Sequence, residues 1–265
     1  MFECRHWVGA ATEGVSGLAR AGQTPWHSHD HAILGVVDGG RQTIALREGA
    51  VAIGPGTGFA IPRGLAHRCA YARDARYRIL CIHAERRLAF GVFSSPAWTA
   101  AFDRAFDALR RGAAVDIDRL IDVTAALTGD PALPRARPPA CVEESLAEVN
   151  SDLEENKRLA ELARRRGLSP FHLQRTFARY VGLTPSQARL CARVRASRRH
   201  LAEGMRPTEV AYLCGFADQS HMTRTFERFM GVAPKRHQRQ LAETLAEAAP
   251  YSPGPRSAKT ESAPR

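Results

Sequence analysis

The chain has 265 residues, 44% hydrophobic and 25% charged, which is an ordinary composition for a globular protein of one large or two modest domains. Its 38 Lys and Arg outnumber its 27 Asp and Glu, and the net charge of +11 points to a polyanionic partner, either nucleic acid or a membrane surface. We expect no transmembrane helix, signal peptide, zinc ribbon or redox cysteine pair, because the sequence shows no apolar run of about 18 residues, no N-terminal leader pattern and no CxxC pair.

Residues 27–83 predict an all-β domain, because short apolar runs alternate there with Gly and Pro breaks. The runs are AILGVV, RQTIAL, AVAIG, FAIP and YRILCIH. Runs of this length and spacing are typical of a barrel or a sandwich. We therefore expect a β-domain over residues 1–95.

Two histidine-containing strings lie in this domain. The first reads HSHDH from His27 to His31, and the second is a Gly-x5-Pro-x-Gly-x2-His pattern that ends at His67. The second string fits the latter half of the cupin motif well. The first fits only in part, because Ile33 and Leu34 stand where the metal-binding Glu of that motif is expected. Residues 1–95 therefore resemble a cupin-type sensor domain, which implies a β-barrel that binds an effector.

Three of these histidines are candidate metal ligands: His27, His29 and His67. Imidazoles can hold Zn²⁺, Ni²⁺, Fe²⁺ or Co²⁺, and Asp30 or His31 can add a fourth ligand. The missing Glu favours a second interpretation, in which the same histidines line the pocket of a small-molecule effector. A third is that they are structural. Arg63 stands beside the second string and can pair with an anionic effector. The expected cofactor is none, or else a divalent transition metal.

Residues 96–127 predict two helices, because their apolar residues recur at helical spacing. One face of the first helix carries Trp98, Phe102, Ala105, Phe106 and Leu109. One face of the second carries Leu120, Ile121, Thr124 and Leu127. Residues 128–140 hold four Pro without a periodic apolar pattern and predict a linker.

The positive charge is concentrated after this linker. Residues 141–156 carry six acidic and no basic side chains, whereas residues 157–240 carry 18 basic and five acidic ones, a net of +13. Residues 241–265, rich in Pro, Ser and Ala towards their end, predict a disordered tail. We therefore expect a basic C-terminal domain over residues 141–240.

This basic segment contains a duplicated motif. Residues 175–185 read RTFARYVGLTP and residues 224–234 read RTFERFMGVAP, with six of the eleven positions identical. Each copy, taken together with the residues before it, predicts a helix, a turn and a second helix. In the first copy Gly167 ends one helix, and Ser169 and Pro170 begin the next, which runs to Gly182. Two such units indicate a pair of helix-turn-helix motifs in an all-α domain.

A long helix is predicted between the two units. Thr184 to Gln187 form a capping box with Pro185 at the first helical position, and the helix extends to about Glu203, roughly 30 Å. Its surface is crowded with arginines. A helix of this length can hold two recognition helices about one DNA turn apart, so that both enter successive major grooves.

Residues 159–239 resemble the DNA-binding domain of the AraC/XylS family of bacterial transcription regulators. The matching strings are LAELARRRGLSPFHLQRTFARYVGLTP and EVAYLCGFADQSHMTRTFERFMGVAPKRHQR. The resemblance implies base-reading residues in the first recognition helix, namely Phe171, Gln174 and Arg175. In the second it implies Gln219, Ser220, His221, Thr223 and Arg224. We also expect Arg193 and Arg198 of the long helix to contact DNA.

The resemblance bears on assembly as well. In this family a helix pair that follows the barrel mediates dimerisation, so residues 96–127 are a candidate dimerisation segment. The alternative is that these helices pack against their own β-domain. Both interpretations stay open, since one face can serve each purpose.

The sequence thus predicts an α+β protein of two domains that binds double-stranded DNA and responds to a small-molecule or metal effector. We expect a cytoplasmic, nucleoid-associated homodimer, an activator more often than a repressor by analogy with the family, which contacts RNA polymerase and no membrane. It is not expected to be an enzyme. The alternative is a cupin-type metal-dependent enzyme with an accessory DNA-binding domain.

Overall fold

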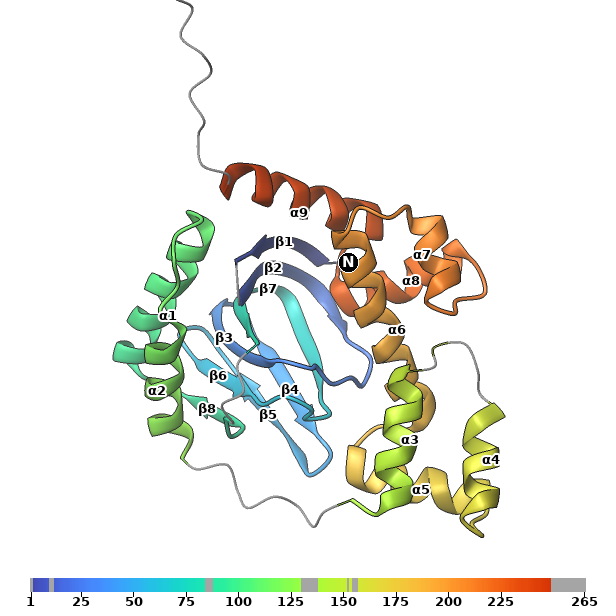
Figure 1. The fold of residues 1–265 in the computed structure, drawn as a ribbon. Coiled ribbons are helices and arrows are strands. Elements are labelled where there is room, and N and C mark those ends of the chain that lie inside the picture. The colour runs from blue at the N-terminus through green and yellow to red at the C-terminus, as the bar shows by residue number, and fades with distance from the viewer. Residues whose placement is uncertain are drawn as a thin grey trace, which may run out of the picture.

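The computed structural model describes residues 2–9, 12–83, 88–129, 138–151, 153 and 157–248. Its N-terminal part, residues 2–93, is called the β-domain below, and residues 138–248 the helical domain (Figure 1). This confirms the predicted α+β architecture. The strands are β1 (Phe2–Val8), β2 (Thr12–Gln23), β3 (Ala32–Gly39), β4 (Gln42–Leu46), β5 (Gly49–Ile53), β6 (Gly58–Ile61), β7 (Arg68–Ile82) and β8 (Gly91–Phe93).

The strands form one curled antiparallel sheet in the order β1-β2-β7-β3-β6-β8, from which the β4–β5 hairpin branches at β7 (Figure 1). Strand β7 is the longest and pairs with β2, β3 and β4. Residues 2–23 add two strands that the sequence analysis did not predict, because they contain few apolar runs. Strand β3 is buried along almost its whole length and β7 at its C-terminal end, so Leu34 and Leu80 both lie in the core.

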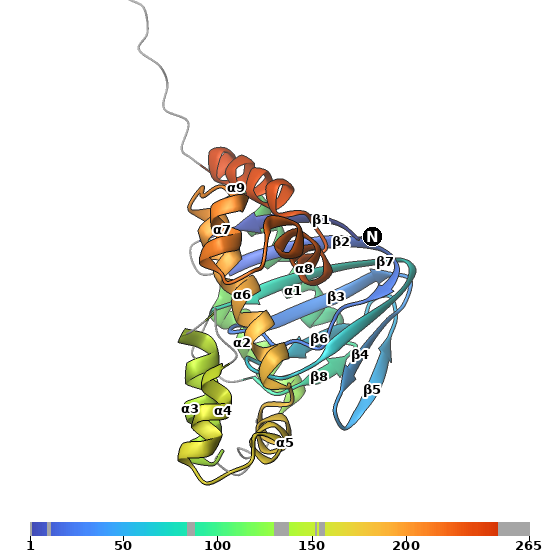
Figure 2. The same cartoon turned by 90° about the vertical axis from the view of Figure 1, so that its right-hand side faces the viewer.

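The helices are α1 (Pro96–Arg110), α2 (Ile117–Thr128), α3 (Ala140–Ser151), α4 (Lys157–Arg165), α5 (Pro170–Val181), α6 (Pro185–Ala202), α7 (Pro207–Leu213), α8 (Gln219–Met230) and α9 (Pro234–Ala248). Helices α1 and α2 lie along one side of the β-domain, and the helical domain lies on the other (Figures 1 and 2).

Helices α1 and α2 use their apolar faces to cover their own sheet. Trp98, Phe102 and Phe106 are fully buried against Leu34 and Leu80 of the sheet. The indole Nε1 of Trp98 donates a hydrogen bond of 2.8 Å to the Thr124 hydroxyl of α2, which locks the two helices together. Of the apolar residues predicted on these faces, Leu127 is the exposed one, at 42%. The interpretation in which the pair packs on its own β-domain therefore accounts for most of the apolar surface.

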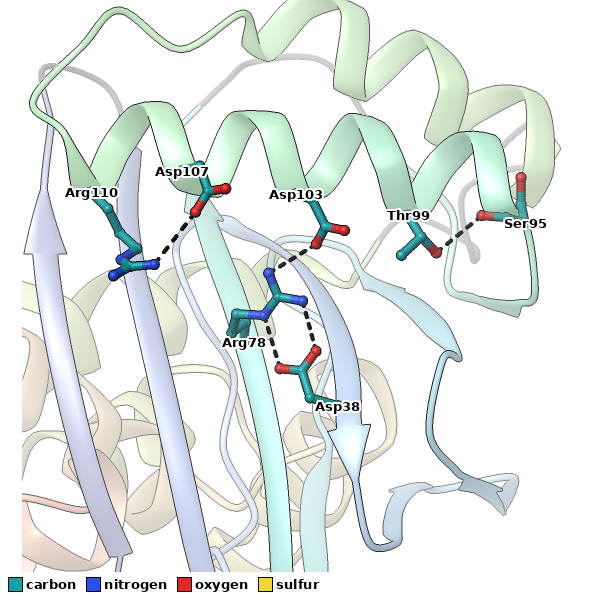
Figure 3. Close-up of polar contacts among 7 residues, drawn as sticks. All are labelled: Asp38, Arg78, Ser95, Thr99, Asp103, Asp107 and Arg110. Carbon is teal, nitrogen blue, oxygen red and sulfur yellow. Dashed lines mark hydrogen bonds and ion pairs between the residues drawn. The ribbon is translucent and has the colours of Figure 1, made fainter.

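A charged cluster ties α1 to the sheet (Figure 3). The guanidinium of Arg78 on β7 donates two hydrogen bonds, of 2.8 and 2.7 Å, to the Asp38 carboxylate and a third, of 2.9 Å, to Asp103 of α1. The planar fork of Arg matches a carboxylate in this two-bond geometry, which Lys cannot reproduce. Figure 3 also shows Ser95, the N-cap of α1, accepting a hydrogen bond from the Thr99 hydroxyl.

The helical domain begins and ends its helices at the residues that the sequence indicated. Ser169 caps α5, with Pro170 at its first position, and Gly182 ends it in the left-handed region at φ 77°. Thr184 and Gln187 form both hydrogen bonds of the predicted capping box at the start of α6. Helix α6 has 18 residues, about 27 Å, and joins the two helix-turn-helix units as expected.

Residues 140–151, whose acidic composition did not predict a helix, form helix α3, whose Val142 and Val149 are buried. Residues 241–248 continue helix α9, so the predicted disordered tail is wrong for them, because Leu241 is buried and Thr244 bonds to the β-domain. Most of the predicted linker, residues 130–137, lies outside the described residues. The rest of the predicted tail, residues 249–265, also lies outside them.

The two domains contact each other at several points. Helix α9 lies along β1, where the Gln240 amide donates to the Cys4 carbonyl (2.8 Å) and the Thr244 hydroxyl to the His6 carbonyl (3.1 Å) (Figure 1). At the other end, Arg47 of the β-domain lies over the Trp26 ring and donates from Nε to the Gly182 carbonyl (2.8 Å). The helical domain is thus docked on the β-domain through the end of α5 and through α9.

Candidate DNA interface and effector cavity

The first turns of α5 and α8 expose the residues that were predicted to read bases. On α5, Phe171 is 71% exposed although it is a large apolar residue. Gln174 and Arg175 are exposed on the same helix. On α8 the exposed residues are Gln219, Ser220 and Arg224, and the half-buried ones are His221 and Thr223. An exposed aromatic at the start of a recognition helix suits contact with a thymine methyl group.

The opposite faces of these helices are buried in the helical core. Leu173 and Phe177 of α5 and Met222 and Phe226 of α8 are each fully buried. Each helix therefore has a fixed orientation, with one face packed and the other available. Asp218 accepts a hydrogen bond of 2.7 Å from the His221 backbone N–H and so caps α8 at its exposed end.

Two arginines of α6 lie elsewhere than expected. Arg193 donates from Nε to the Leu153 carbonyl (2.8 Å) and lies 5.7 Å from the Phe216 ring centre, inside the helical domain. Arg198 points to the β-domain, where it pairs with Glu13, and its side chain is only 17% exposed. Both arginines therefore have protein partners in this structure, which disfavours the expectation that they contact DNA without testing it. Helical periodicity cannot tell which arginines of α6 pack within the helical domain or turn towards the β-domain.

A cavity of about 110 Å³ lies between the domains and contains the predicted histidines. Most of its lining comes from the curled sheet, including apolar Val15, Ile33, Phe59 and Ile61. The last turn of α8 supplies Phe229, Met230 and Gly231, so the second helix-turn-helix unit closes the cavity. Phe229 lies edge-on to His27, with ring centres 6.0 Å apart.

The local backbone holds His27 and His67 together. The two residues pair in an isolated β-bridge, with both N–H to carbonyl distances at 2.9 Å. Each ring donates its Nδ1 proton to the carbonyl two residues earlier, at 2.8 Å to Pro25 and 2.9 Å to Leu65. These bonds fix the tautomer that leaves each Nε2 with a lone pair.

The three histidines are held neutral. Burial lowers the pKa of His27 to about 4, and burial together with His27 lowers the pKa of His67 to about 3. The pKa of His29 is lowered too, first by burial and then by the two other rings. Neutral imidazole is the form that coordinates metals and accepts hydrogen bonds.

This donor set fits a divalent transition metal. One nitrogen from each of His27, His29 and His67 lies within 4.8 Å of the others. Two nitrogens on one tetrahedral Zn²⁺ are about 3.4 Å apart, so the rings would have to approach one another by up to about 1.4 Å to share one ion. The backbone carbonyls that orient two of the rings are the kind of outer partner that metal-binding histidines use. Asp30 bonds instead to His31 Nδ1 (3.1 Å).

Arg63 does not line this cavity. It is exposed and borders a second, wider cleft of about 730 Å³ between the β-domain and α6. The expectation that Arg63 belongs to the histidine pocket is therefore corrected. The loop that carries it turns at Gly64, with φ 79°, and sends His67 inward while Arg63 stays outside.

The sequence analysis missed the charged residues of the cavity. Glu13 and Arg198 line both the cavity and the cleft, and their ion pair stands between the two spaces. Burial alone would raise the pKa of Glu13, but the nearby His83 ring, 3.7 Å away, and the charge of Arg198 lower it to about 2. No local pattern marks Glu13, because its partner is 185 positions away in the chain.

Comparison with known proteins identifies both domains. Residues 13–163 match the family model of the AraC-like ligand binding domain, and residues 162–240 match that of a helix-turn-helix domain. The HTH-type transcriptional regulator YbfI of Bacillus subtilis is 38% identical over 68 residues, 26% of this chain and 25% of YbfI. Rv1931c of Mycobacterium tuberculosis, another HTH-type transcriptional regulator, is 35% identical over 86 residues, 32% of this chain and 33% of the relative. The matches thus span a quarter to a third of these relatives.

The fold as a whole is similar to that of ToxT from Vibrio cholerae O395. The two share 12% identity with a TM-score of 0.57, over 91% of this chain and 98% of ToxT. A ToxT structure from strain SCE256 with an unsaturated fatty acid bound gives a TM-score of 0.56 at the same identity, over 91% of this chain and 96% of that one. At this identity the similarity shows a shared fold.

Proposed function

Because the chain belongs to the AraC/XylS family of transcription regulators, we propose that it binds specific double-stranded DNA and regulates transcription in response to a ligand of its β-domain. One observation carries the proposal. Both recognition helices expose their first turns, whereas their last turns lie against the β-domain, where α8 closes the cavity. A ligand in that cavity therefore contacts the DNA-reading unit directly.

On this proposal the base-reading residues are Phe171, Gln174 and Arg175 of α5 and Gln219, Ser220, His221, Thr223 and Arg224 of α8. Gln can pair with adenine and Arg with guanine or a phosphate, while Phe suits a thymine methyl group. Arg193 and Arg198 leave this set because of the contacts described above. Six of the remaining side chains are exposed and two, His221 and Thr223, are half-buried, which supports their assignment.

The effector is either a small molecule or a metal ion. An apolar cavity with a few polar groups is the usual form of a small-molecule site. The bound fatty acid in ToxT supports a small-molecule effector at the level of the fold. If a metal is the effector, His27, His29 and His67 hold it, and it would supply positive charge at the centre of the cavity.

We extend the proposal by analogy with the family. The protein acts in the cytoplasm as a homodimer and as an activator that contacts RNA polymerase. A dimer contact through α1 and α2 would have to use their outer face near Leu127, because their apolar faces pack on the β-domain. In the described residues no helix has both the length and the apolar character needed to cross a membrane.

Binding of the full chain to DNA tests the proposal. The DNA is the region upstream of its own gene, and the competitor is a scrambled duplex of equal length. Fluorescence anisotropy in 50–300 mM KCl should give a preference for the upstream region, with an affinity that falls steeply as the salt rises. Equal affinity for both duplexes would refute the proposal. Stoichiometric metal with a turnover that His67→Ala abolishes would support a cupin-type enzyme instead.

A further inference from the structure

The ion pair of Glu13 and Arg198 separates the histidine cavity from the wide cleft between the domains. Both residues line both the cavity and the cleft. A ligand that enters the cavity from the cleft by passing between these two side chains must therefore displace the pair. Glu13 comes from β2 and Arg198 from α6, the helix that joins the two helix-turn-helix units. The pair is thus also a contact between the two domains.

Only one of the two donors on the Nε–Nη2 edge of the Arg198 guanidinium has a hydrogen-bond partner among the described residues. Its Nη2 donates to Glu13, whereas its Nε is buried and finds no hydrogen-bond partner among the described residues. A carboxylate that approaches side-on accepts from Nε and Nη2 at once, which is the preferred geometry of such pairs. His6 lines the same cavity, is only 5% exposed and also leaves its Nε2 without a partner in the described part of the chain. The cavity therefore contains two buried polar groups that a ligand can satisfy.

Glu13 has a second partner at hand. Its other carboxylate oxygen, Oε1, lies 3.7 Å from His83 Nε2, on the side of the cleft. If a ligand takes Arg198, Glu13 keeps this contact and is not left as an isolated buried charge, which would be costly. The exchange of one carboxylate for another at Arg198 leaves the number of ion pairs unchanged.

The approach to the pair favours anions. Four arginines line the cleft, namely Arg63, Arg195, Arg198 and Arg199. They face three carboxylates, those of Glu13, Asp30 and Glu203. An excess of one charge sign in a cleft raises the local concentration of ligands of the opposite sign. Beyond the pair, the cavity walls are mainly apolar side chains, among them Ile33, Phe59 and Ile79.

From these observations we propose that the Glu13–Arg198 pair is an exchangeable gate and that the effector is a small carboxylate with an apolar body. The carboxylate replaces Glu13 on Arg198, and the apolar body enters the cavity beneath the last turn of α8. The inference rests on the proposed function, since it names the class of effector and the residue that recognises it. Binding of the carboxylate also breaks the contact between Glu13 of β2 and Arg198 of α6. This links ligand binding to the helix between the two DNA-reading units.

Isothermal titration calorimetry of the full chain with butanoate, hexanoate and octanoate tests this inference, and the primary alcohols of equal length are the comparison. We expect at least one carboxylate to bind about tenfold to a hundredfold more tightly than its alcohol. Arg198→Gln should abolish this preference. Arg199→Gln is the matched control, because Arg199 lines only the cleft, and it should leave the preference in place.

The decisive variant is Glu13→Gln. It removes the competing carboxylate while keeping the shape of the side chain, so it should tighten carboxylate binding by about tenfold. His83→Gln removes the alternative partner of Glu13 and should weaken binding, which keeps the inference testable if Glu13→Gln does not fold. Binding of alcohols as tight as that of carboxylates, absence of carboxylate binding, or unchanged affinity in both variants would overturn it. The DNA assay on the same sample separates this outcome from failure of the proposed function.

Discussion

Gly182 and Gly231 occupy equivalent positions in the two helix-turn-helix units, 49 residues apart, and both end a recognition helix against the β-domain. Their φ angles are 77° and 70°, in the left-handed region that glycine adopts most readily. The carbonyl of Gly182 accepts the bond from Arg47, and Gly231 lines the histidine cavity. The two copies of the duplicated sequence thus have equivalent surroundings. In each recognition helix the first turn is exposed, and the C-terminal end lies against the β-domain.

Gly182→Ala should destabilise this docking. The new Cβ would lie 2.6 Å from the Cβ of Ala66, and the left-handed backbone adds strain of about 1–2 kcal/mol. Gly204→Ala is the control, because its φ is 87° but a Cβ there meets nothing within 4 Å. Urea denaturation should show a larger loss of unfolding free energy for Gly182→Ala than for Gly204→Ala. Equal losses would mean that the contact with Ala66 adds nothing.

Thr124→Val should destabilise the β-domain by about 1–3 kcal/mol, since it leaves the buried Trp98 indole N–H without its acceptor. Thr128→Val is the matched control. Both hydroxyls donate to the carbonyl four residues earlier, Thr124 to Leu120 and Thr128 to Thr124, but Thr128 is only half-buried and Trp98 donates to Thr124. Thermal unfolding monitored by circular dichroism measures both variants. A cost for Thr128→Val as large as that for Thr124→Val would contradict this reading of the α1–α2 contact.

Arg224→Ala should weaken specific DNA binding by about 1–3 kcal/mol and relax the preference at one base position. Arg224 is exposed in the N-terminal half of α8, whereas Arg228, exposed on the last turn of the same helix, provides a control of equal charge. Anisotropy titrations against a set of single-base variants of the operator measure the effect. An equal loss on every sequence would make Arg224 a phosphate contact.

The stability of the protein should fall as the pH drops from about 6.5 towards 4. Burial lowers the folded-state pKa of His67 to about 3, whereas the unfolded chain takes up the proton near pH 6.5. Between these values the unfolded state binds one more proton at this residue, which costs about 1.4 kcal/mol of stability per pH unit on acidification.

His67→Asn removes this linkage. The slope of unfolding free energy against pH, measured by urea denaturation from pH 4.5 to 6.5, should decrease by about one proton. The matched control is His172→Asn, because His172 is exposed on α5 and meets water in the folded protein as well. A slope in His67→Asn that equals that of the unmodified chain would show that His67 is not the buried neutral histidine described here.

The local features of this fold were predictable from the sequence. Ser169, Thr184 and Gly182 act through bonds to residues within a few positions, so a short motif contains all the information needed. The histidine cluster was predictable for a related reason: the two strings that carry His27 and His67 match a known motif, the second well and the first in part, and the structure pairs these two residues in an isolated β-bridge.

The contacts between the domains were not predictable in this way. Arg198 and Arg63 were assigned by their position on one element, yet the neighbour that each meets depends on how the two domains dock. Glu13 lies on β2, a strand with small and charged residues that gives little apolar signal. Helices α3 and α9 owe their order to packing as well, since Val149 and Leu241 are buried by distant parts of the chain.

Whether the two recognition helices read successive major grooves is tested most directly by a footprint of the full chain on its upstream DNA. Two recognition helices joined by an α6 of about 27 Å predict two protected clusters about 10 base pairs apart on one face of the duplex. Arg224→Ala should weaken the cluster read by α8 and leave the cluster read by α5. A single protected cluster, or uniform weakening of both by Arg224→Ala, would contradict the account.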